Sequence, residues 1–331
     1  MMEHPRVSVS IITYNQVRYI RKAIESVLAQ EVDFPIEIII GDDFSTDGTR
    51  EILIEYQAKY PDKIFLILHP RRYEGVPGRL NNITNLYTCR GQYIALLEGD
   101  DYWADDGKLQ RQVDFLDQHP DYVLSFHDAL MVWESEDHPN RRFSEQRPML
   151  NRDGAFSHEQ LAEDWLIPTG SLVFRNSALG EFPDWFWEVI SADYALILLI
   201  SRHGKAFYFH RPDSIYRQHE TSFMNVYYFE QKNLIQSLKD FETFRHEFKA
   251  VENAHSWPHR WGGIFFGVLL GYLRKGQLLA MLRFAANRIY AHPYSVMYMA
   301  GYLRRELPGY LRRLLLSKLF RSSPNSRVIL L

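Results

Sequence analysis

Cysteine is nearly absent from this chain of 331 residues, because Cys89 is its single example. One cysteine excludes an intrachain disulfide and any zinc site built from several cysteines. Such scarcity suits a reducing compartment, which favours the cytoplasm. An excess of charge of one sign is also lacking, since 38 basic and 41 acidic residues give a formal net charge of −3. We therefore expect no nucleic-acid partner.

Long hydrophobic runs are missing as well. No run reaches the ~18 apolar residues that a membrane-spanning helix needs. The longest near-match, residues 261–273 (WGGIFFGVLLGYL), stops at Arg274 and predicts a buried or interfacial helix. The N-terminal MMEHPRVSVS has no apolar stretch before a cleavage site, so we expect no signal peptide.

The composition is that of a globular protein. Hydrophobic residues make up 46% of the chain, charged residues 24% and aromatic residues 15%, which excludes a disordered chain or a fibre. The length predicts one large α/β domain with an appendage, or two modest domains. We place a domain at 1–222, with halves at 1–130 and 131–222, and a helical region at 223–331.

The spacing of apolar residues predicts the secondary structure. Residues 1–130 alternate short apolar runs with helical patterns, which is typical of βαβ units and a mainly parallel, Rossmann-like sheet flanked by helices. Strands are expected at 7–12, 36–40, 64–68, 93–97, 122–126, 171–174 and 206–209, and helices at 17–30, 46–60, 82–89, 108–118 and 194–203. Residues 134–151 read as a loop, and everything after about 223 as helix.

The C-terminal tail has its own charge pattern. Residues 301–331 hold seven basic residues and one acidic residue, with leucines between them in YLRRLLLSKLF. This is the pattern of a basic amphipathic helix that lies on an anionic membrane, which would place the protein peripherally at the inner face of the cell membrane. The alternative is a solvated helix that packs its leucines on its own domain.

Polar clusters follow three of the predicted strands. Thr13-Tyr14-Asn15 follows the first, Asp42-Asp43 the second and Glu98-Gly99-Asp100-Asp101 the fourth. Each could be an ordinary turn or a helix cap. The carboxyl ends of parallel strands, however, form the ligand crevice of open α/β sheets.

Carboxylates that are brought together repel one another unless a cation lies between them. Hard oxygen ligands select Mg²⁺ or Mn²⁺, usually shared with substrate phosphates. The dinucleotide Gly-x-Gly-x-x-Gly loop does not follow the first strand, and a Walker-type Gly-Lys-Ser/Thr motif is lacking. These absences disfavour dinucleotide-binding and P-loop proteins.

The segments VSVSIITYNQVRYIRKAIESVLAQ, IEIIIGDDFSTDGT and RGQYIALLEGDDYW together resemble the nucleotide-sugar domain of inverting family 2 glycosyltransferases, which have the GT-A fold. The resemblance covers about residues 5–220. It implies transfer of a sugar from a nucleoside diphosphate, with Mn²⁺ or Mg²⁺ as cofactor. The family's first metal-motif aspartate is replaced here by Glu98, which leaves the direct role of this residue open.

The resemblance also implies roles for residues of the first half. Asp43 would hydrogen-bond the base, typically uracil, Asp42 would support that loop, and Asp101 would bind the metal. The nucleotide-sugar site would further include Thr13, Tyr14, Asn15, Arg79, Asn81 and Asp100.

In the second half, the resemblance implies the acceptor side and part of the diphosphate site. ISADYALILLISRHGK makes Asp193 the candidate catalytic base, although an acidic residue at a helix N-terminus also stabilises the helix dipole. SIYRQHETS would bring Arg217 to the diphosphate and His219 to the metal. Trp103 would stack on a sugar or simply pack, and Thr169, within Pro-Thr-Gly, would line the acceptor pocket.

The sequence thus predicts an inverting glycosyltransferase that moves a sugar from a UDP-sugar to a glycan or lipid-linked acceptor in surface polysaccharide assembly. A sugar nucleotidyltransferase is disfavoured because no Gly-rich, Lys/Arg-bearing loop follows the first strand. A non-catalytic nucleotide-sugar or glycan-binding protein is the other alternative, for which Glu98 is the hint. The sugar, the acceptor, the choice among UDP, dTDP and GDP, and the oligomeric state stay open.

Overall fold

A computed structural model describes residues 4–304, apart from 136–137, 223–226, 228–229, 253, 255, 295 and 301. Except for residues 302–304, the tail that was predicted to be a basic amphipathic helix lies outside the described residues.

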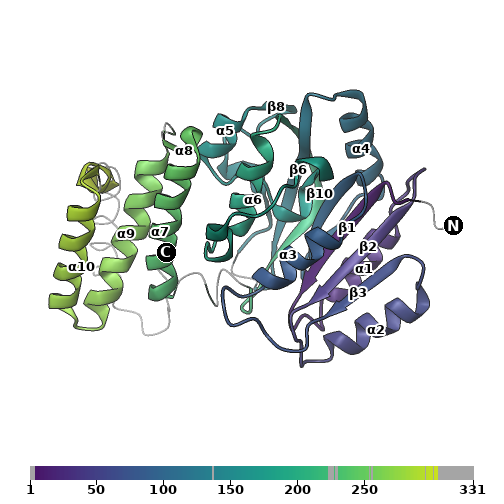
Figure 1. Ribbon diagram of the computed structural model, residues 1–331, viewed down its shortest axis with the longest axis horizontal. Helices are drawn as coiled ribbons and strands as arrows, with labels where there is room; N and C mark the ends of the chain where they lie inside the picture. The colour runs from purple at the N-terminus through teal and green to yellow at the C-terminus, as the bar shows by residue number, and fades with distance from the viewer. Residues whose placement is uncertain are drawn as a thin grey trace.

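The first half forms the predicted alternation of strands and helices. The predicted strands and helices are confirmed, and most bounds differ by a few residues at the ends (Figure 1). The elements are β1 (Val7–Thr13), α1 (Ile20–Leu28), β2 (Ile36–Asp42), α2 (Thr49–Lys59), β3 (Ile64–Leu68), α3 (Arg79–Thr88), β4 (Tyr93–Glu98), β5 (Tyr102–Trp103), α4 (Lys108–Gln118) and β6 (Tyr122–Trp133).

The second half adds short strands and one long one. Its elements are β7 (Arg141–Arg142), β8 (Gly154–Phe156), α5 (His158–Glu163), β9 (Val173–Arg175), α6 (Ala192–Ser201) and β10 (Lys205–Gln218), with 3₁₀ turns at Phe143–Gln146, Thr169–Ser171, Asn176–Ala178 and Asp184–Trp187. Two predictions need correction. Residues 134–151 are not all loop, and β10 extends far beyond 206–209. The sequence hid β10 because Pro212 interrupts its pattern, and the pairing with β6 shifts register on both sides of that proline.

The strands form one mixed, mainly parallel sheet in the order β3-β2-β1-β4-β9-β6-β10-β5, with β7 beside β6 and β8 beside β10. Strands β3, β2, β1 and β4 are parallel, and β9 runs antiparallel between β4 and β6. In the register of β1, Thr13 lies opposite Asp42 and Ile12 opposite Glu98. The carboxyl ends of β1, β2 and β4 therefore meet at one edge, as the sequence predicted.

The C-terminal helices α7 (Gln231–Glu247), α8 (Lys249–Glu252), α9 (Trp257–Arg274) and α10 (Leu278–Ala291) lie at the end of the molecule away from β1–β3 (Figure 1). They are not detached from the sheet domain, because Phe244 and Trp257 belong to the same buried apolar cluster as Tyr194 of α6 and Phe126 of β6. None of the helices in the described part of the chain is both long and apolar enough to cross a bilayer.

Candidate active site

The loops after β1 and β2 are tied together at the sheet edge. Asn15 has a positive φ of 50°, a conformation that asparagine tolerates better than most residues. Its N–H donates to Ser45 Oγ at 2.8 Å, and its Oδ1 accepts from the N–H of Thr46 at 2.9 Å. The nearby Asp42 accepts from Arg50 Nε at 2.5 Å. Asp42 thus has the supporting role expected of it.

The Asp43 carboxylate contacts two other segments of the chain, at Gly78 and at Arg72. Its Oδ2 accepts from the N–H of Gly78 at 3.2 Å and lies 3.8 Å from Arg72 Nε. The Arg72 guanidinium in turn lies 3.8 Å above the ring of Tyr14. Burial raises the pKa of Asp43, and its Oδ1 has no hydrogen-bond partner in the described structure. An unpartnered buried acceptor beside an aromatic ring suits an N–H of a planar base.

Three carboxylates lie at the carboxyl end of β4: Glu98 is its last residue, and Asp100 and Asp101 follow it. Burial, with the negative charge of Asp100, raises the pKa of Glu98 to about 8. Burial, with the charges of Asp100 and Glu98, also raises the pKa of Asp101 well above its usual value. The Oδ1 of Asp101 accepts from the N–H of Arg217 at 2.8 Å. The end of β10 therefore reaches this cluster, as the resemblance implied.

Arg217 and His219 lie directly beside these carboxylates. Arg217 Nη1 donates to the carbonyl oxygen of Asp100 at 2.6 Å, and its guanidinium lies over the rings of Tyr102 and Tyr19. His219 Nε2 lies 3.0 Å from Asp100 Oδ2, and its ring centroid is 4.7 Å from that of Tyr19. The structure thus supplies a cation and an imidazole next to the carboxylates.

Asp193 occupies the first turn of α6. Burial raises its pKa, and the backbone N–H of Tyr194 and the Trp165 side chain partly oppose that effect. The negative charge of Asp193 also raises the pKa of Glu98, whereas the Thr169 side chain lowers it. Asp193, Thr169 and Glu98 are thus brought together. A base with a raised pKa is better matched to proton transfer near neutral pH than an ordinary aspartate.

Three predicted site residues are buried and hydrogen-bond the backbone. Trp103 is 3% exposed and its indole N–H donates to the carbonyl oxygen of Gly170 at 2.7 Å, which favours packing over sugar stacking. Asn81 is 1% exposed and donates to the carbonyl oxygen of Gly41 at 2.8 Å. Arg79 is 2% exposed and donates to the carbonyl oxygen of Val189, and its charge acts on Asp193. The nucleotide contacts of Asn81 and Arg79 stay a prediction.

Sequence reasoning missed several residues around the site. Arg72 follows the third strand. A basic residue after the carboxyl end of a parallel strand is a sequence signal that could have identified it. Trp165 and Tyr216 gave no local signal, because loop and strand bring them to Asp193 from distant positions. Their rings lie 6.3 Å apart, and the charges of Asp101, Glu98 and Asp193 contribute to raising the pKa of Tyr216 after burial.

The oxygen donors of the carboxylate cluster limit how a metal ion could bind. Within the described residues, no group of three His, Cys, Asp or Glu side chains is arranged to hold a metal ion by itself. Mg²⁺ and Mn²⁺ commonly take one or two carboxylates and complete their shell with substrate phosphates and water. Asp101 and Asp100, whose charges repel each other here, fit that incomplete set. The residues therefore fit a metal that arrives with a diphosphate.

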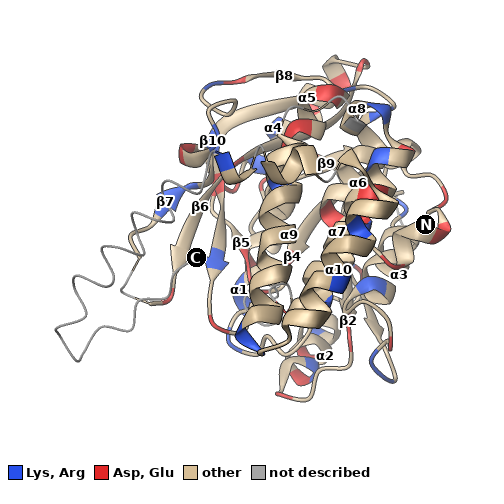
Figure 2. Cartoon of the chain, turned by 90° about the vertical axis from the view of Figure 1, so that its left-hand side faces the viewer, with Lys and Arg blue, Asp and Glu red and all other residues tan. Residues whose placement is uncertain are grey.

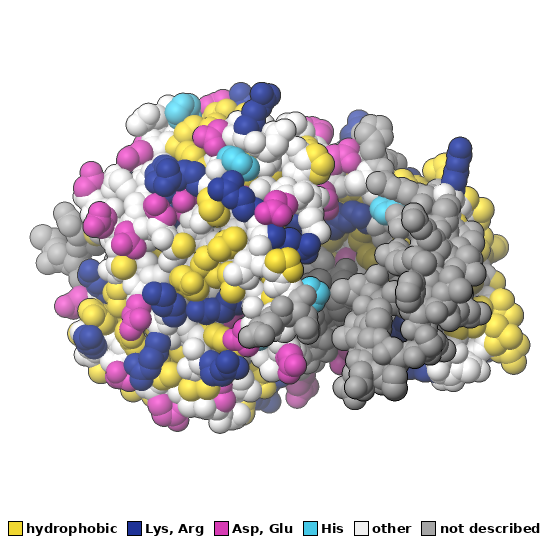
Figure 3. Space-filling model, turned by 180° about the vertical axis from the view of Figure 1, so that it is seen from behind, with side chains coloured by type: hydrophobic (Ala, Val, Ile, Leu, Met, Phe, Trp, Pro, Cys, Tyr) yellow, Lys and Arg dark blue, Asp and Glu magenta, His cyan; other side chains and the backbone are white. Residues whose placement is uncertain are grey.

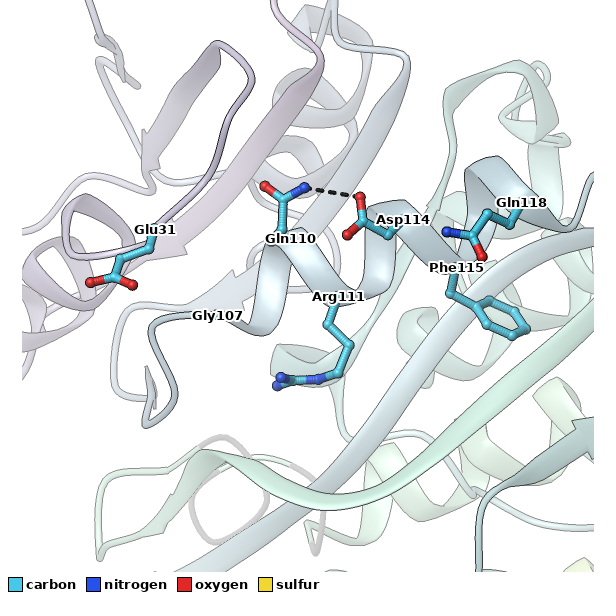
Figure 4. A pocket seen from close by; sticks show the side chains of 7 residues that line it. All are labelled: Glu31, Gly107, Gln110, Arg111, Asp114, Phe115 and Gln118. Atoms are coloured by element: carbon cyan, nitrogen blue, oxygen red, sulfur yellow. Dashed lines mark hydrogen bonds between the residues drawn. The ribbon is translucent and has the colours of Figure 1, made fainter.

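A surface hollow of the described structure lies away from these residues. It has a volume of about 500 Å³ along α4, between Glu31, Gly107, Gln110, Arg111, Asp114, Phe115 and Gln118 (Figure 4). Arg111 is already paired with Asp105 at 2.8 Å and Asp213 at 2.6 Å. The hollow shares no residue with the carboxylate cluster, and we assign it no role.

A mainly parallel sheet with polar and acidic side chains at the carboxyl ends of β1, β2 and β4 is the arrangement of a GT-A glycosyltransferase. The sequence profile described as "Glycosyl transferase family 2" matches residues 8–178. The chain therefore belongs to glycosyltransferase family 2, whose members use nucleotide-sugar donors.

Individual proteins are also similar to this chain. An uncharacterised protein of Mycobacterium tuberculosis, Rv1520, is 35% identical over 213 residues, which are 64% of this chain and 59% of that protein. S. aureus TarS in complex with UDP-GlcNAc is similar in structure, with a TM-score of 0.57, 18% identity, and coverage of 82% of this chain and 88% of that one.

The mannosyltransferase PcManGT from Pyrobaculum calidifontis, in complex with GDP-Man and Mn²⁺, has a TM-score of 0.55 and 17% identity, with coverage of 97% of this chain and 89% of that one. These two structural likenesses show the fold.

Proposed function

We propose that this protein is a metal-dependent inverting glycosyltransferase that moves a sugar from a UDP-sugar to a glycan or lipid-linked acceptor in surface polysaccharide assembly. The observation that carries the proposal is that Arg217 contacts Asp101 and that the charges of Asp100 and Asp193 both act on Glu98. A sugar diphosphate placed between these groups has a cation for its leaving group and a base for its acceptor.

The nucleoside would bind at Tyr14, Asp43 and Arg72. Asp43 has a free buried acceptor atom for a base N–H. Uracil presents such an N–H between its two carbonyl groups, and the Arg72 guanidinium, close to Asp43, can donate to one of these carbonyl oxygens. Thr13 and Asn15 hold the surrounding loops. The bound UDP-GlcNAc of TarS supports UDP as donor, whereas the GDP-Man of PcManGT makes GDP the alternative to test.

In the transfer step, Asp193 accepts the proton of the acceptor hydroxyl while that oxygen forms a bond to the anomeric carbon. The bond between the anomeric carbon and the diphosphate oxygen breaks on the opposite face, and its electron pair leaves with the diphosphate. One displacement inverts the anomeric configuration. Arg217 lies where the negative charge of the leaving group develops, which is where a fixed cation is most effective.

The bound metal would supply further neutralisation of the diphosphate. Asp101 and Asp100 would hold it, and His219 would complete this side of the site once its contact with Asp100 is exchanged for the cation. We propose that Thr169 and Trp165 contact the acceptor. Trp165 takes the place of Trp103, because the Trp165 ring lies beside Asp193 and is partly exposed.

A donor screen tests the proposal. The protein is titrated calorimetrically with UDP, GDP and dTDP, with and without Mn²⁺, and the preferred nucleoside diphosphate sugar is then followed for metal-stimulated release of its diphosphate. We expect UDP to bind most tightly and Mn²⁺ to strengthen binding. Tight binding without any hydrolysis or transfer would favour the non-catalytic alternative, and metal-independent binding would remove the metal from the proposal.

A further inference from the structure

The outer face of α10 exposes large apolar side chains. Leu279 is 81% exposed, Leu282 53% and Tyr290 90%, and their spacing places them on one face of the helix. On the opposite face, Phe284 packs on Phe265 of α9 at a centroid distance of 5.8 Å. Helix α10 thus carries apolar side chains on both faces, and α9 covers one of them. None of the residues of α10 is buried. A helix that is apolar all round is normally buried.

The same part of the chain carries positive charge without negative charge. Residues 253–305 contain seven basic residues and no Asp or Glu, so neither α9 nor α10 has an acidic side chain (Figure 2). Arg274 and Arg283 are exposed, and no carboxylate in the described part of the chain pairs with either. Arg288 differs, since it turns inward to Glu242 at 2.9 Å. Uncompensated positive charges therefore lie beside exposed leucines.

Figure 3 shows hydrophobic side chains gathered at the same end of the molecule. We propose that the outer face of α10, with the α9–α10 turn from Leu273 to Leu278, docks on the surface of an anionic lipid bilayer. The apolar side chains would enter the boundary between headgroups and acyl chains, and Arg274, Lys275 and Arg283 would contact anionic headgroups.

Charge distinguishes an anionic bilayer from the other partners that could cover the outer face of α10. A second copy in a two-fold dimer would bring the same arginines against one another, because such an interface uses the same patch on both subunits. The chain's own tail at 301–331, with seven basic residues and one acidic residue, would also meet like charge. An anionic bilayer is complementary in both charge and hydrophobicity. The proposal goes beyond the glycosyl-transfer function and does not depend on it.

Vesicle sedimentation of the full chain, without donor or metal, tests this. We expect binding to vesicles of phosphatidylglycerol and phosphatidylcholine, weak binding to phosphatidylcholine alone, and weaker binding at 1 M salt, where charges are screened over about 3 Å. The double variant Leu279→Glu/Tyr290→Glu should bind roughly tenfold or more weakly, because two apolar anchors are lost. Arg283→Gln should lose about fivefold, or about 1 kcal/mol.

Ile54→Glu is the matched control, because Ile54 is 50% exposed on α2, and it should bind like the unchanged protein. Melting temperatures establish folding, and Leu279→Ser/Tyr290→Ser replaces the double variant if that does not fold. A chain ending at residue 304 should still bind. Equal binding by the double variant would overturn the proposal. Loss of vesicle binding by the truncated chain but not by the double variant would also overturn the proposal. So would a full-length protein that does not bind vesicles but forms a dimer, if the double variant dissociates that dimer.

Discussion

Asp240 on α7 accepts a hydrogen bond from the backbone N–H of Ile190 at 2.7 Å, and this contact joins the C-terminal helices to the segment that leads into Asp193. From the other side, Arg79 on α3 donates to the carbonyl oxygen of Val189. Asp240 is 2% exposed, and burial raises its pKa to about 6. The segment before the candidate base is therefore held by two buried charged residues from different helices.

This burial predicts a pH dependence of stability. The pKa of Asp240 is about 6 in the folded protein against an ordinary value of 3.8, so the folded state binds the proton more tightly. The contribution of Asp240 to stability is therefore most favourable below about pH 4. It declines as the pH rises to about 6 and is constant above that. The full loss is on the order of 3 kcal/mol.

Asp240→Asn cannot titrate, so its free energy of unfolding should rise relative to that of the unchanged protein between pH 4 and pH 7. Urea unfolding at four pH values measures the difference. The exposed Glu181→Gln variant controls for the loss of one carboxylate. Parallel stability curves for the Asp240 variant and the unchanged protein would contradict this prediction.

A second prediction concerns the metal. Asp101→Ala removes one of the two carboxylates that fit a cation shared with the diphosphate, so the gain in UDP affinity on adding Mn²⁺ should fall by roughly ten- to hundredfold. Calorimetry with and without Mn²⁺ measures this gain. Asp106→Ala, which changes an exposed aspartate on the far side of β5, is the control and should keep the full gain. If Asp101→Ala keeps it too, Asp101 is not a metal ligand.

The proposed role of Asp43 in binding the base can be tested without phosphate or metal. Asp43→Ala removes the unpartnered acceptor that would receive a base N–H, so binding of uridine alone should weaken by roughly ten- to hundredfold. Ligand-observed NMR can follow such weak binding. The exposed Asp62→Ala should bind uridine normally. Unchanged uridine binding by a folded Asp43→Ala protein would place the base elsewhere.

Periodicity predicted the β1–β4 framework because buried parallel strands read as continuous apolar runs. It predicted the sheet-edge clusters for the same reason, since each followed such a run. It could not predict which way a side chain turns. Arg79 and Asn81 have the polarity of ligands, yet both point inward to the carbonyl oxygens of Val189 and Gly41. A long strand such as β10 was also hidden, because Pro212 and its polar neighbours break the two-residue alternation.

The acceptor side was the least predictable part. Trp165 reaches Asp193 through a loop, and Asp240 reaches the adjacent backbone from the C-terminal helices. Such contacts depend on packing between distant segments, which no local pattern records. The helices after residue 230 were predicted as helices, but their shared core with the sheet domain was not. The division at 222/223 therefore stays a prediction.

The final prediction separates chemistry from binding at Asp193. Asp193→Asn keeps the shape of the side chain but cannot accept a proton. A positioned base contributes about 10²–10⁴-fold, so sugar transfer should fall by that order. Donor affinity should change little, because Asp193 lies on the acceptor side of the cluster. If Asp193 only stabilises the dipole of α6, the variant should instead lose roughly 0.3–1 kcal/mol of stability and keep near-normal transfer.

Three measurements on the one variant decide between these outcomes: the melting temperature, the affinity for UDP, and the rate of transfer from a UDP-sugar. Asp184→Asn and Glu188→Gln are the matched controls, since both carboxylates are exposed on the segment before α6 and neither acts on the carboxylate cluster. Both controls should keep normal transfer. The combination of normal UDP binding, normal folding and near-normal transfer in Asp193→Asn would remove Asp193 as the base. A control variant that loses transfer while it still binds UDP would then identify its replacement, because a base acts on the acceptor hydroxyl and not on the nucleotide.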